Sequence, residues 1–343
     1  MVPVERRARI LSHIVSEYVN TAVPVGSATV VRKYGLPISA ATVRNEMARL
    51  EEEGFITHPH TSAGRIPSDK GYRFYVETLM EEEELPWDER QAIREQVYRM
   101  TRVAGRAEPM EEQARIAATV LAETVQNAAV ATAPRAPRCR LQHLELLELS
   151  GRRALLVAVF SGAYVRRRVV NLAAPVEQEE LATAAGRLSE RFGGLTTDEI
   201  RFAEVALSPL EEEVTGTLLE LMAEEDRALY DQAYLEGLRN VLSQPEFAQT
   251  DAVIDLLCVL EEGNLMRVIP FEALAGEGVT VVIGEENRED VMHRCSIVLS
   301  RYGVPGMAVG ALAVLGPTRM AYSRIIPTVR YLSSLMGQLV AQG

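Results

Sequence analysis

Hydrophobic positions in the first 80 residues recur at helical spacing, interrupted by glycine and proline. Three helices are predicted, over residues 3–20, 27–34 and 40–53, because each carries an apolar stripe bounded by capping or helix-breaking residues. Ser27 and Ser39 are the expected caps at the start of the second and third helices. The pattern therefore predicts a small helical bundle at the start of the chain.

Alternating apolar and polar residues follow the third helix, which is typical of a short strand. Residues 55–60 are predicted to form this strand, 61–64 a tight turn in which Gly64 takes positive φ, and 65–67 the returning strand. Ser68 can cap a fourth helix that carries aromatic residues. Three helices followed by a β-hairpin is the arrangement of a winged helix-turn-helix.

The rest of the chain alternates between helical patterns and strand-like runs. The strand-like runs form two groups, separated by about a hundred residues of mainly helical pattern. The predicted strands are 141–149, 152–162 and 163–172 in the first group and 279–284, 295–300 and 308–315 in the second. Helices are expected at 109–127 and 322–339. Two separated sheet-forming stretches predict an α+β domain with an insertion.

The third helix has two faces of different character. Val43, Met47 and Leu50 form an apolar stripe that can pack on the other helices. A second, polar stripe offers hydroxyl, amide and guanidinium groups, which pair with base edges and phosphates in a DNA major groove. The alternative is an ordinary solvated face, and this helix alone leaves both open. The members of the polar stripe are Thr42, Asn45 and Arg49, flanked by Arg44.

The hairpin favours DNA binding, because its tip can lie against the backbone or minor groove of DNA. Arg65 would there meet strong negative potential, while Tyr72 and Tyr75 are expected to pack beneath the hairpin. The predicted DNA-contacting residues are Ser39, Thr42, Arg44, Asn45, Arg49, His58, His60, Thr61, Ser62, Arg65, Lys70 and Arg73.

Charge is distributed unevenly along the chain, whose formal net charge is −12. The first 80 residues carry ten Lys or Arg and eight Asp or Glu, whereas the remainder carries 26 and 40. A slightly basic head on an acidic body suits a protein that touches DNA with one end only.

Metal sites and membrane segments find little support in the sequence. His58 and His60 share one face of a predicted strand, but no third ligand follows at metal-binding spacing, so no metal or cofactor is expected. The start of the chain lacks the apolar segment of a secretory signal, and glycine and proline interrupt the long uncharged stretch 302–318. We expect a cytoplasmic protein that does not associate with membranes.

Cysteine usage and motif content argue against an enzyme. Cys139, Cys258 and Cys295 are scattered, as expected for small buried side chains in a reducing compartment. No phosphate-binding loop, nucleophile elbow or HExxH motif is present, and His293 beside Cys295 is an uninformative pairing. The run Arg166 to Arg168 is either a nucleic-acid patch or, as we favour, the charged edge of a sheet.

Residues 39–76, "SAATVRNEMARLEEEGFITHPHTSAGRIPSDKGYRFYV", resemble the head of the heat-inducible transcription repressor HrcA family. Three further segments, 237–247, 281–287 and 310–329, resemble the same family in the same order. The resemblance implies a GAF-like domain split by a mainly helical inserted dimerisation domain. The expected boundaries are a winged-helix domain at 1–80, a connecting helix at 81–105, the GAF-like domain at 106–172 and 276–343, and the inserted domain at 173–275.

The same resemblance implies a function and its partners. A homodimer is expected to bind double-stranded DNA at an inverted repeat upstream of chaperone operons, the CIRCE element. The chaperonin GroEL is expected to keep the repressor folded, so that repression is lost on heat shock. A regulator gated by a small molecule bound near residues 278–287 and 313–320 is the alternative function.

Overall fold

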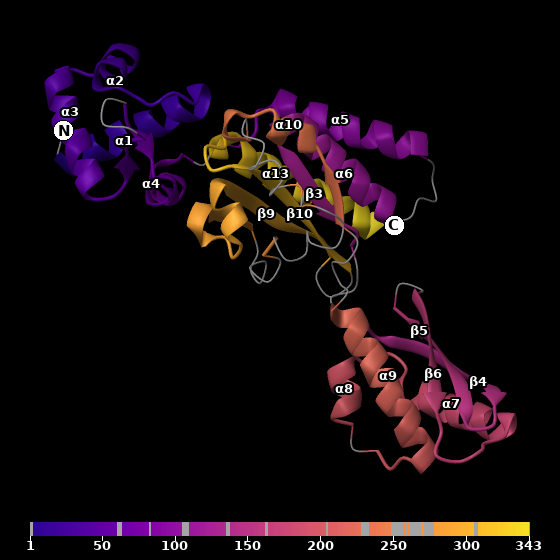
Figure 1. Cartoon of the computed structure of the whole chain (residues 1–343). Helices are drawn as coiled ribbons and strands as arrows, with labels where there is room; N and C mark the ends of the chain where they lie inside the picture. The colour runs from indigo at the N-terminus through magenta and orange to yellow at the C-terminus, as the bar shows by residue number, and fades with distance from the viewer. Residues whose placement is uncertain are drawn as a thin grey trace. The chain divides into compact units, whose positions relative to one another are not determined.

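The computed structural model describes residues 3–59, 64–81, 84–104, 110–134, 138–161, 164–203, 205–227, 233–247, 257, 260, 269–270, 278–304 and 308–342 (Figure 1). It has a mixed α+β architecture. The described residues fall into two compact units, the first within 1–133, 232–303 and 310–343 and the second within 134–231 and 304–309.

The first unit begins with the helices and hairpin of the head, where the hydrophobic pattern predicted them. Val25 adds a single bridge to Arg65 beside the hairpin. One cap differs from the prediction, because Gly26 holds the N-cap position of the second helix and Ser27 is its first helical residue. The elements are α1 (Pro3–Thr21), α2 (Ser27–Tyr34), α3 (Ala40–Glu52), β1 (Ile56–Thr57), β2 (Ile66–Pro67), α4 (Asp69–Phe74) and a π-helical turn (Tyr75–Leu79).

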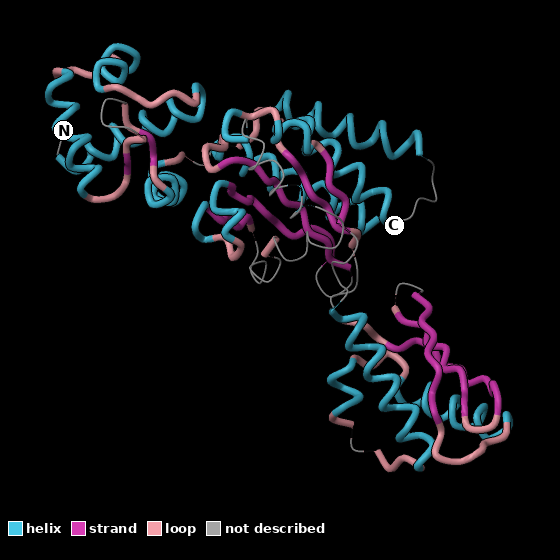
Figure 2. The backbone as a smooth tube through the Cα atoms, in the orientation of Figure 1, coloured by secondary structure: helices cyan, strands magenta, loops and turns pink. Residues whose placement is uncertain are grey.

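The centre of this unit is a five-stranded sheet in the order β7-β3-β10-β9-β8. Its strands are β3 (Ala128–Thr132), β7 (Ala233–Glu236), β8 (Val279–Ile283), β9 (Cys295–Val304) and β10 (Ala308–Pro317). The strands at 279–284, 295–300 and 308–315 were predicted, whereas β3 and β7 were not. Figure 2 shows the sheet with the helices that accompany it.

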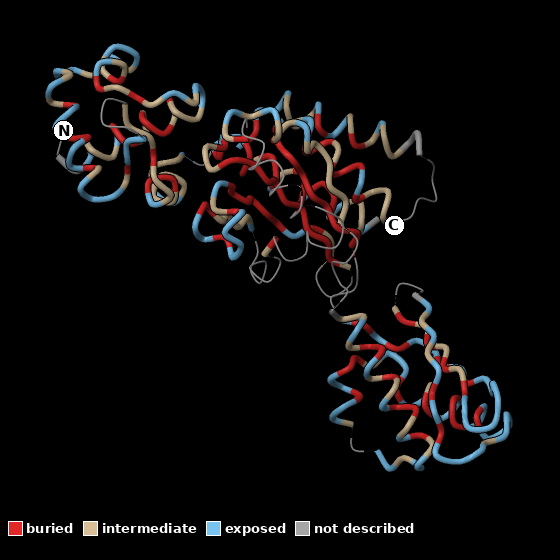
Figure 3. The backbone as a smooth tube through the Cα atoms, in the orientation of Figure 1, coloured by how far each residue is buried: buried red, intermediate tan, exposed pale blue. Residues whose placement is uncertain are grey.

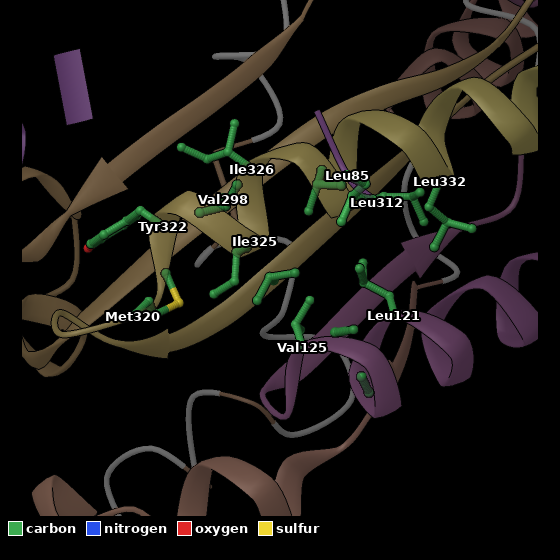
Figure 4. Close-up of a cluster of buried hydrophobic side chains, with 14 of the residues drawn as sticks. Leu85, Leu121, Val125, Val298, Leu312, Met320, Tyr322, Ile325, Ile326 and Leu332 are labelled. Carbon is green, nitrogen blue, oxygen red and sulfur yellow. The ribbon is translucent and has the colours of Figure 1, made fainter. Parts of the chain in front are cut away.

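Three helices accompany this sheet: α5 (Trp87–Ala104), α6 (Met110–Val125) and α13 (Tyr322–Gln342). α6 and α13 contact its strands, and α5 packs on these two helices. Leu121 of α6, Leu312 of β10 and Ile325 of α13 belong to one buried cluster (Figure 4). The predicted connecting helix is part of the body, because α5 packs on α6 and α13 and its Ile93 and Val97 are buried. A short helix, α10 (Leu238–Leu242), follows β7 and packs near β3.

The second unit is inserted between two neighbouring strands of this sheet. β3 and β7 pair antiparallel with Thr132 opposite Ala233. The chain therefore leaves the sheet at the end of β3 and re-enters it alongside. Adjacent strand ends let a hundred residues fold as a separate unit without interrupting the sheet.

This second unit contains its own three-stranded antiparallel sheet, in the order β4-β5-β6. The elements are β4 (Leu141–Ser150), β5 (Arg153–Phe160), β6 (Tyr164–Asn171), α7 (Gln178–Phe192), α8 (Thr197–Arg201) and α9 (Pro209–Arg227). The strands lie where they were predicted, and they share a hydrophobic core with α7 and α9 rather than with the five-stranded sheet. The compact units therefore divide at 133/134 and 231/232, whereas the predicted boundaries of the inserted domain were 172/173 and 275/276.

The two faces of the β4-β5-β6 sheet differ in burial (Figure 3). One face packs on α7 and α9 and includes Leu144, Leu156 and Phe160, each at most 2% exposed. The other face carries apolar side chains that the unit leaves open. Leu147 and Val169 lie on either side of Leu155 in a cross-strand row and are 46% and 44% exposed.

Candidate nucleic-acid interface

The α3 helix turns three polar side chains of the predicted stripe toward solvent. Arg44, Asn45 and Arg49 are exposed, and no described residue forms a hydrogen bond or ion pair with their side chains. The opposite face is buried, as expected, with Val43 fully covered and Leu50 only 3% exposed. The helix therefore presents two guanidinium groups and an amide from a backbone that the core of the head holds in place.

The beginning of α3 is capped as the sequence predicted. The Ser39 hydroxyl accepts a hydrogen bond from the backbone N–H of Thr42 at 3.1 Å, and the two hydroxyls are 2.9 Å apart. This bond satisfies one of the unpaired amides of the first helical turn. The first role of Ser39 and Thr42 is thus to fix where the helix starts; their contact with DNA stays a prediction.

A buried carboxylate anchors α3 to α1, and the sequence interpretation missed it. Glu46 is only 4% exposed and forms ion pairs with Arg6 and Arg7 of α1. Arg7 also pairs with Glu53 beyond the end of α3. A buried charge needs such partners, because burial without them is costly. The available signal was the position of Glu46 beside the apolar stripe, at i+3 from Val43.

The stem of the hairpin is tied to the last turn of α3 by Glu51. Its carboxylate pairs with His58, just after β1, and lies 2.7 Å from Nη2 of Arg65, just before β2. Burial acts to raise the pKa of Glu51, but the hydrogen bond from His58 and the charge of Arg65 outweigh it, so the pKa lies below its ordinary value.

Gly64 is required for a reason other than the predicted one. It does not adopt positive φ. A Cβ atom at this position would lie 2.6 Å from the carbonyl carbon and oxygen of Pro24. The glycine therefore allows the hairpin to approach the chain before α2 closely enough for Arg65 to exchange two backbone hydrogen bonds with Val25.

The two cations of α4 are engaged within the protein. Lys70 donates to the backbone carbonyl of Glu53 at 2.8 Å and lies over the Phe55 ring. The Arg73 guanidinium pairs with the carboxylate of Glu286 and donates to the Val281 carbonyl at 2.7 Å. We therefore withdraw Arg73 from the predicted DNA contacts, because its guanidinium already has partners in the body.

The other residues predicted near the hairpin differ in exposure and in the partners that they contact. His58 is exposed but paired with Glu51. Tyr72 is 1% exposed and its ring packs against Tyr322, so it has a packing role, although this partner belongs to α13 and not to the hairpin beneath which it was expected to lie. Three predicted contacts, His60, Thr61 and Ser62, lie outside the described residues.

Elsewhere, the described residues offer no competing chemical site. They contain no group of three or more His, Cys, Asp or Glu side chains placed to hold a metal ion. Cys139 and Cys295 are buried as predicted, and burial raises the pKa of each thiol to about 12, which disfavours the reactive thiolate. Cys258 lies outside the described residues. Among the helices described, none has both the length and the apolar character needed to cross a membrane.

The arginine run of the second unit lies on β6, an edge strand, as favoured from the sequence. Arg166 pairs with Glu225, and Arg168 pairs with Glu220 and Glu224, all on α9. These two guanidinium groups therefore stabilise the packing of β6 on α9, and this run is not a free basic patch for nucleic acid.

Comparison with known proteins identifies the family. Residues 111–326 match the family model "HrcA protein C terminal domain". The chain belongs to the HrcA family. Its relatives include the heat-inducible transcription repressors HrcA of Chloroflexus aggregans, 43% identical over 98% of this chain and 93% of that protein, and Dehalococcoides mccartyi, 39% identical over 97% and 94%. HrcA is a family of transcription repressors rather than enzymes, which confirms the expectation from the sequence that the protein is not an enzyme.

A solved structure supports the fold. A crystal structure of a hypothetical protein at 2.2 Å resolution aligns with 98% of both chains at a TM-score of 0.57 and 22% identity. At this identity the likeness shows that the two chains share an architecture, and it assigns no activity.

Proposed function

We propose that this protein represses transcription of heat-shock genes by binding DNA through its head, with α3 in the major groove and the hairpin as the wing of a winged helix. The observation that carries this proposal is the outer face of α3. Arg44, Asn45 and Arg49 project from it without partners among the described residues, whereas Arg6, Arg7 and Arg73 are paired inside the protein. Bidentate contacts from arginine to guanine and from asparagine to adenine are the commonest specific contacts in that groove.

The remaining predicted contacts divide into two groups. Ser39 and Thr42, at the start of α3, are placed to meet the DNA backbone where the helix enters the groove. Arg65, with His58, His60, Thr61 and Ser62, belongs to the wing, which we assign to the backbone or minor groove. Lys70 has a smaller role, because its ammonium group is already hydrogen bonded to the Glu53 carbonyl.

We further propose that the protein acts as a homodimer on an inverted repeat of the CIRCE type. One recognition helix reads only a short half-site, whereas two helices related by a twofold axis read a symmetric operator with much greater affinity. In the body, we assign the GAF-like domain to the five-stranded sheet with its helices and the dimerisation role to the inserted second unit.

The open face of the β4-β5-β6 sheet is suited to a second copy of the chain. Its exposed side chains are mainly apolar, with Leu147, Leu155 and Val169 in one row. In the next row, Glu145 and Arg167 lie on opposite sides of Val157. A twofold axis through this face lets each Glu145 approach Arg167 of the other copy, so the face is complementary to itself in charge as well as in polarity.

The response to heat follows from the same family assignment. We propose that the cytoplasmic repressor depends on the chaperonin GroEL for folding, and that heat shock diverts the chaperonin to unfolded proteins. Repression then falls because less folded repressor is present. This mechanism requires only a marginally stable native state, since about 1.4 kcal/mol changes the ratio of folded to unfolded protein tenfold.

An electrophoretic mobility shift with the full chain tests this function. The DNA is a chaperone-promoter fragment that carries the inverted repeat, with a scrambled repeat as control, at two temperatures and with and without GroEL. We expect a complex with the intact repeat only, less of it at the higher temperature, and recovery when GroEL and ATP are added. Equal binding to both fragments would refute operator recognition, and indifference to GroEL would refute the chaperonin step alone.

A further inference from the structure

The carboxylate of Glu51 is paired with Arg65, the cation of the hairpin that the proposed function assigns to DNA. Glu51 Oε2 lies 2.7 Å from Nη2 of Arg65, and Oε1 of the same carboxylate pairs with His58. The Arg65 and Glu51 side chains are 27% and 25% exposed, so the pair lies at the surface and not in the core. Arg65 is thus already paired when DNA arrives.

The backbone around Arg65 is held by two hydrogen bonds, whereas its side chain is held by the surface ion pair with Glu51. The N–H of Arg65 donates to the Val25 carbonyl at 2.9 Å, and its carbonyl accepts from the Val25 N–H at 2.8 Å. The Nε–H of Arg65 is buried and has no acceptor among the described residues, so Glu51 is the described partner that the guanidinium would have to leave. A change of partner therefore requires only a rotation of the side chain, with the strand held in place.

We propose that Glu51 is an internal competitor of DNA phosphate for Arg65, and so sets how much sequence-independent affinity the wing contributes. This inference rests on the proposed function, because it takes the head as the DNA-binding part. In the free protein the guanidinium is neutralised by Glu51. In the complex it turns to a phosphate, and Glu51 keeps His58 as its partner.

The exchange of Glu51 for phosphate at Arg65 changes how strongly the affinity for DNA depends on salt, which a purely structural ion pair would not do. A free arginine that binds phosphate releases about one condensed counterion, which steepens the dependence of affinity on salt by roughly 0.9 logarithmic units. An arginine that leaves a carboxylate releases little, because the vacated carboxylate attracts a cation in return. Glu51 thereby lowers the affinity for all DNA and leaves a larger share of it to the base contacts of α3.

The experiment measures binding of the full chain to inverted-repeat and random duplexes by fluorescence anisotropy over a series of salt concentrations. The variants are E51Q, R65A and the double variant E51Q/R65A. The matched control is E52Q, which removes the same charge from the neighbouring exposed residue. Glu52 forms no ion pair with the part of the chain that the structure describes. Thermal melting verifies that each variant is folded.

We expect E51Q to bind both duplexes about two- to tenfold more tightly and with a salt dependence steeper by up to about one unit. We expect E52Q to raise the affinity for DNA less than E51Q does. When Arg65 is replaced by alanine, adding E51Q should raise the affinity no more than E52Q does. Weaker binding by folded E51Q, or the same gain in the R65A background, would overturn the inference. A wild-type protein that does not prefer the inverted repeat would instead refute the proposed function.

Discussion

The outer face of α3 and the open face of the β4-β5-β6 sheet are both exposed, and they differ in chemistry. The helix presents Arg44, Asn45 and Arg49, which are polar and unpaired among the described residues. The sheet presents rows of Leu and Val, with Leu147 46% and Val169 44% exposed. Charged and amide groups suit a nucleic acid, whereas a mainly apolar sheet face suits another protein surface.

Exposure alone therefore does not indicate a binding site. Arg168 and Arg166 belong to an arginine-rich strand, yet they pair with glutamates of α9. Arg44 and Arg49 have no partner among the described residues and are available to DNA, whereas Arg166 and Arg168 are held by glutamates of α9. Arg65 lies between these cases, because Glu51 is the competitor proposed above.

The largest effect is expected from placing charge on the open sheet face. The double variant Leu147→Glu/Val169→Glu brings like charges together in a face that we propose is buried between two copies. The dimer should dissociate, and affinity for the inverted repeat should fall by about 100-fold or more, because binding loses its second head. Sedimentation velocity and anisotropy measure the two effects.

The control for this variant is Val205→Glu, which changes an exposed valine of the same unit outside the sheet. It should leave both the dimer and DNA binding unchanged. A double variant that remains dimeric would show that the seam lies elsewhere in the molecule.

The next effect concerns base recognition. Asn45→Ala or Arg49→Ala should weaken operator binding by about 1–3 kcal/mol, with little change on random DNA, because base contacts carry the sequence preference. Arg99→Ala, which removes an exposed arginine of α5, is the control. Equal losses on operator and random duplexes would contradict base reading by this face.

A smaller and less selective effect is expected at the wing. Arg65→Ala should weaken binding to operator and random DNA by a similar factor, about two- to fivefold, because a contact with phosphate does not read sequence. Competition titrations with both duplexes give this ratio. A loss confined to the operator would move Arg65 from the backbone to the bases.

The smallest effect on DNA binding is expected at Arg73. Its guanidinium is held by Glu286 and the Val281 carbonyl. Arg73→Gln should change operator affinity less than twofold, while it lowers the melting temperature by a few degrees through the lost ion pair. A tenfold loss of affinity without a change in stability would restore Arg73 as a DNA contact.

The sequence predicted the head well because its signals are local. Ser39 and Ser68 cap α3 and α4 as expected, and the apolar stripe of α3 is buried. The buried role of Glu46 was missed, because its partners lie about 40 residues earlier, on α1. The close approach that requires Gly64 likewise depends on a distant segment, at Pro24.

The body was predicted less completely because its decisive contacts are distant. β3 is the segment 128–132, in which three of the five residues are alanine, a residue depleted in strands, and it adjoined a predicted helix. β7 is only four residues long and stands in a segment of helical pattern. Since these two strands pair across the whole insertion, the insertion's ends could not be located without them.

Recognition of symmetric DNA by paired heads can be measured with two duplexes of equal length. One carries the intact inverted repeat, and the other has one half-site scrambled. We predict that the full chain binds the intact repeat at least about 100-fold more tightly, with two chains per duplex by sedimentation. Equal affinity for the two duplexes, or one chain per intact repeat, would contradict the account.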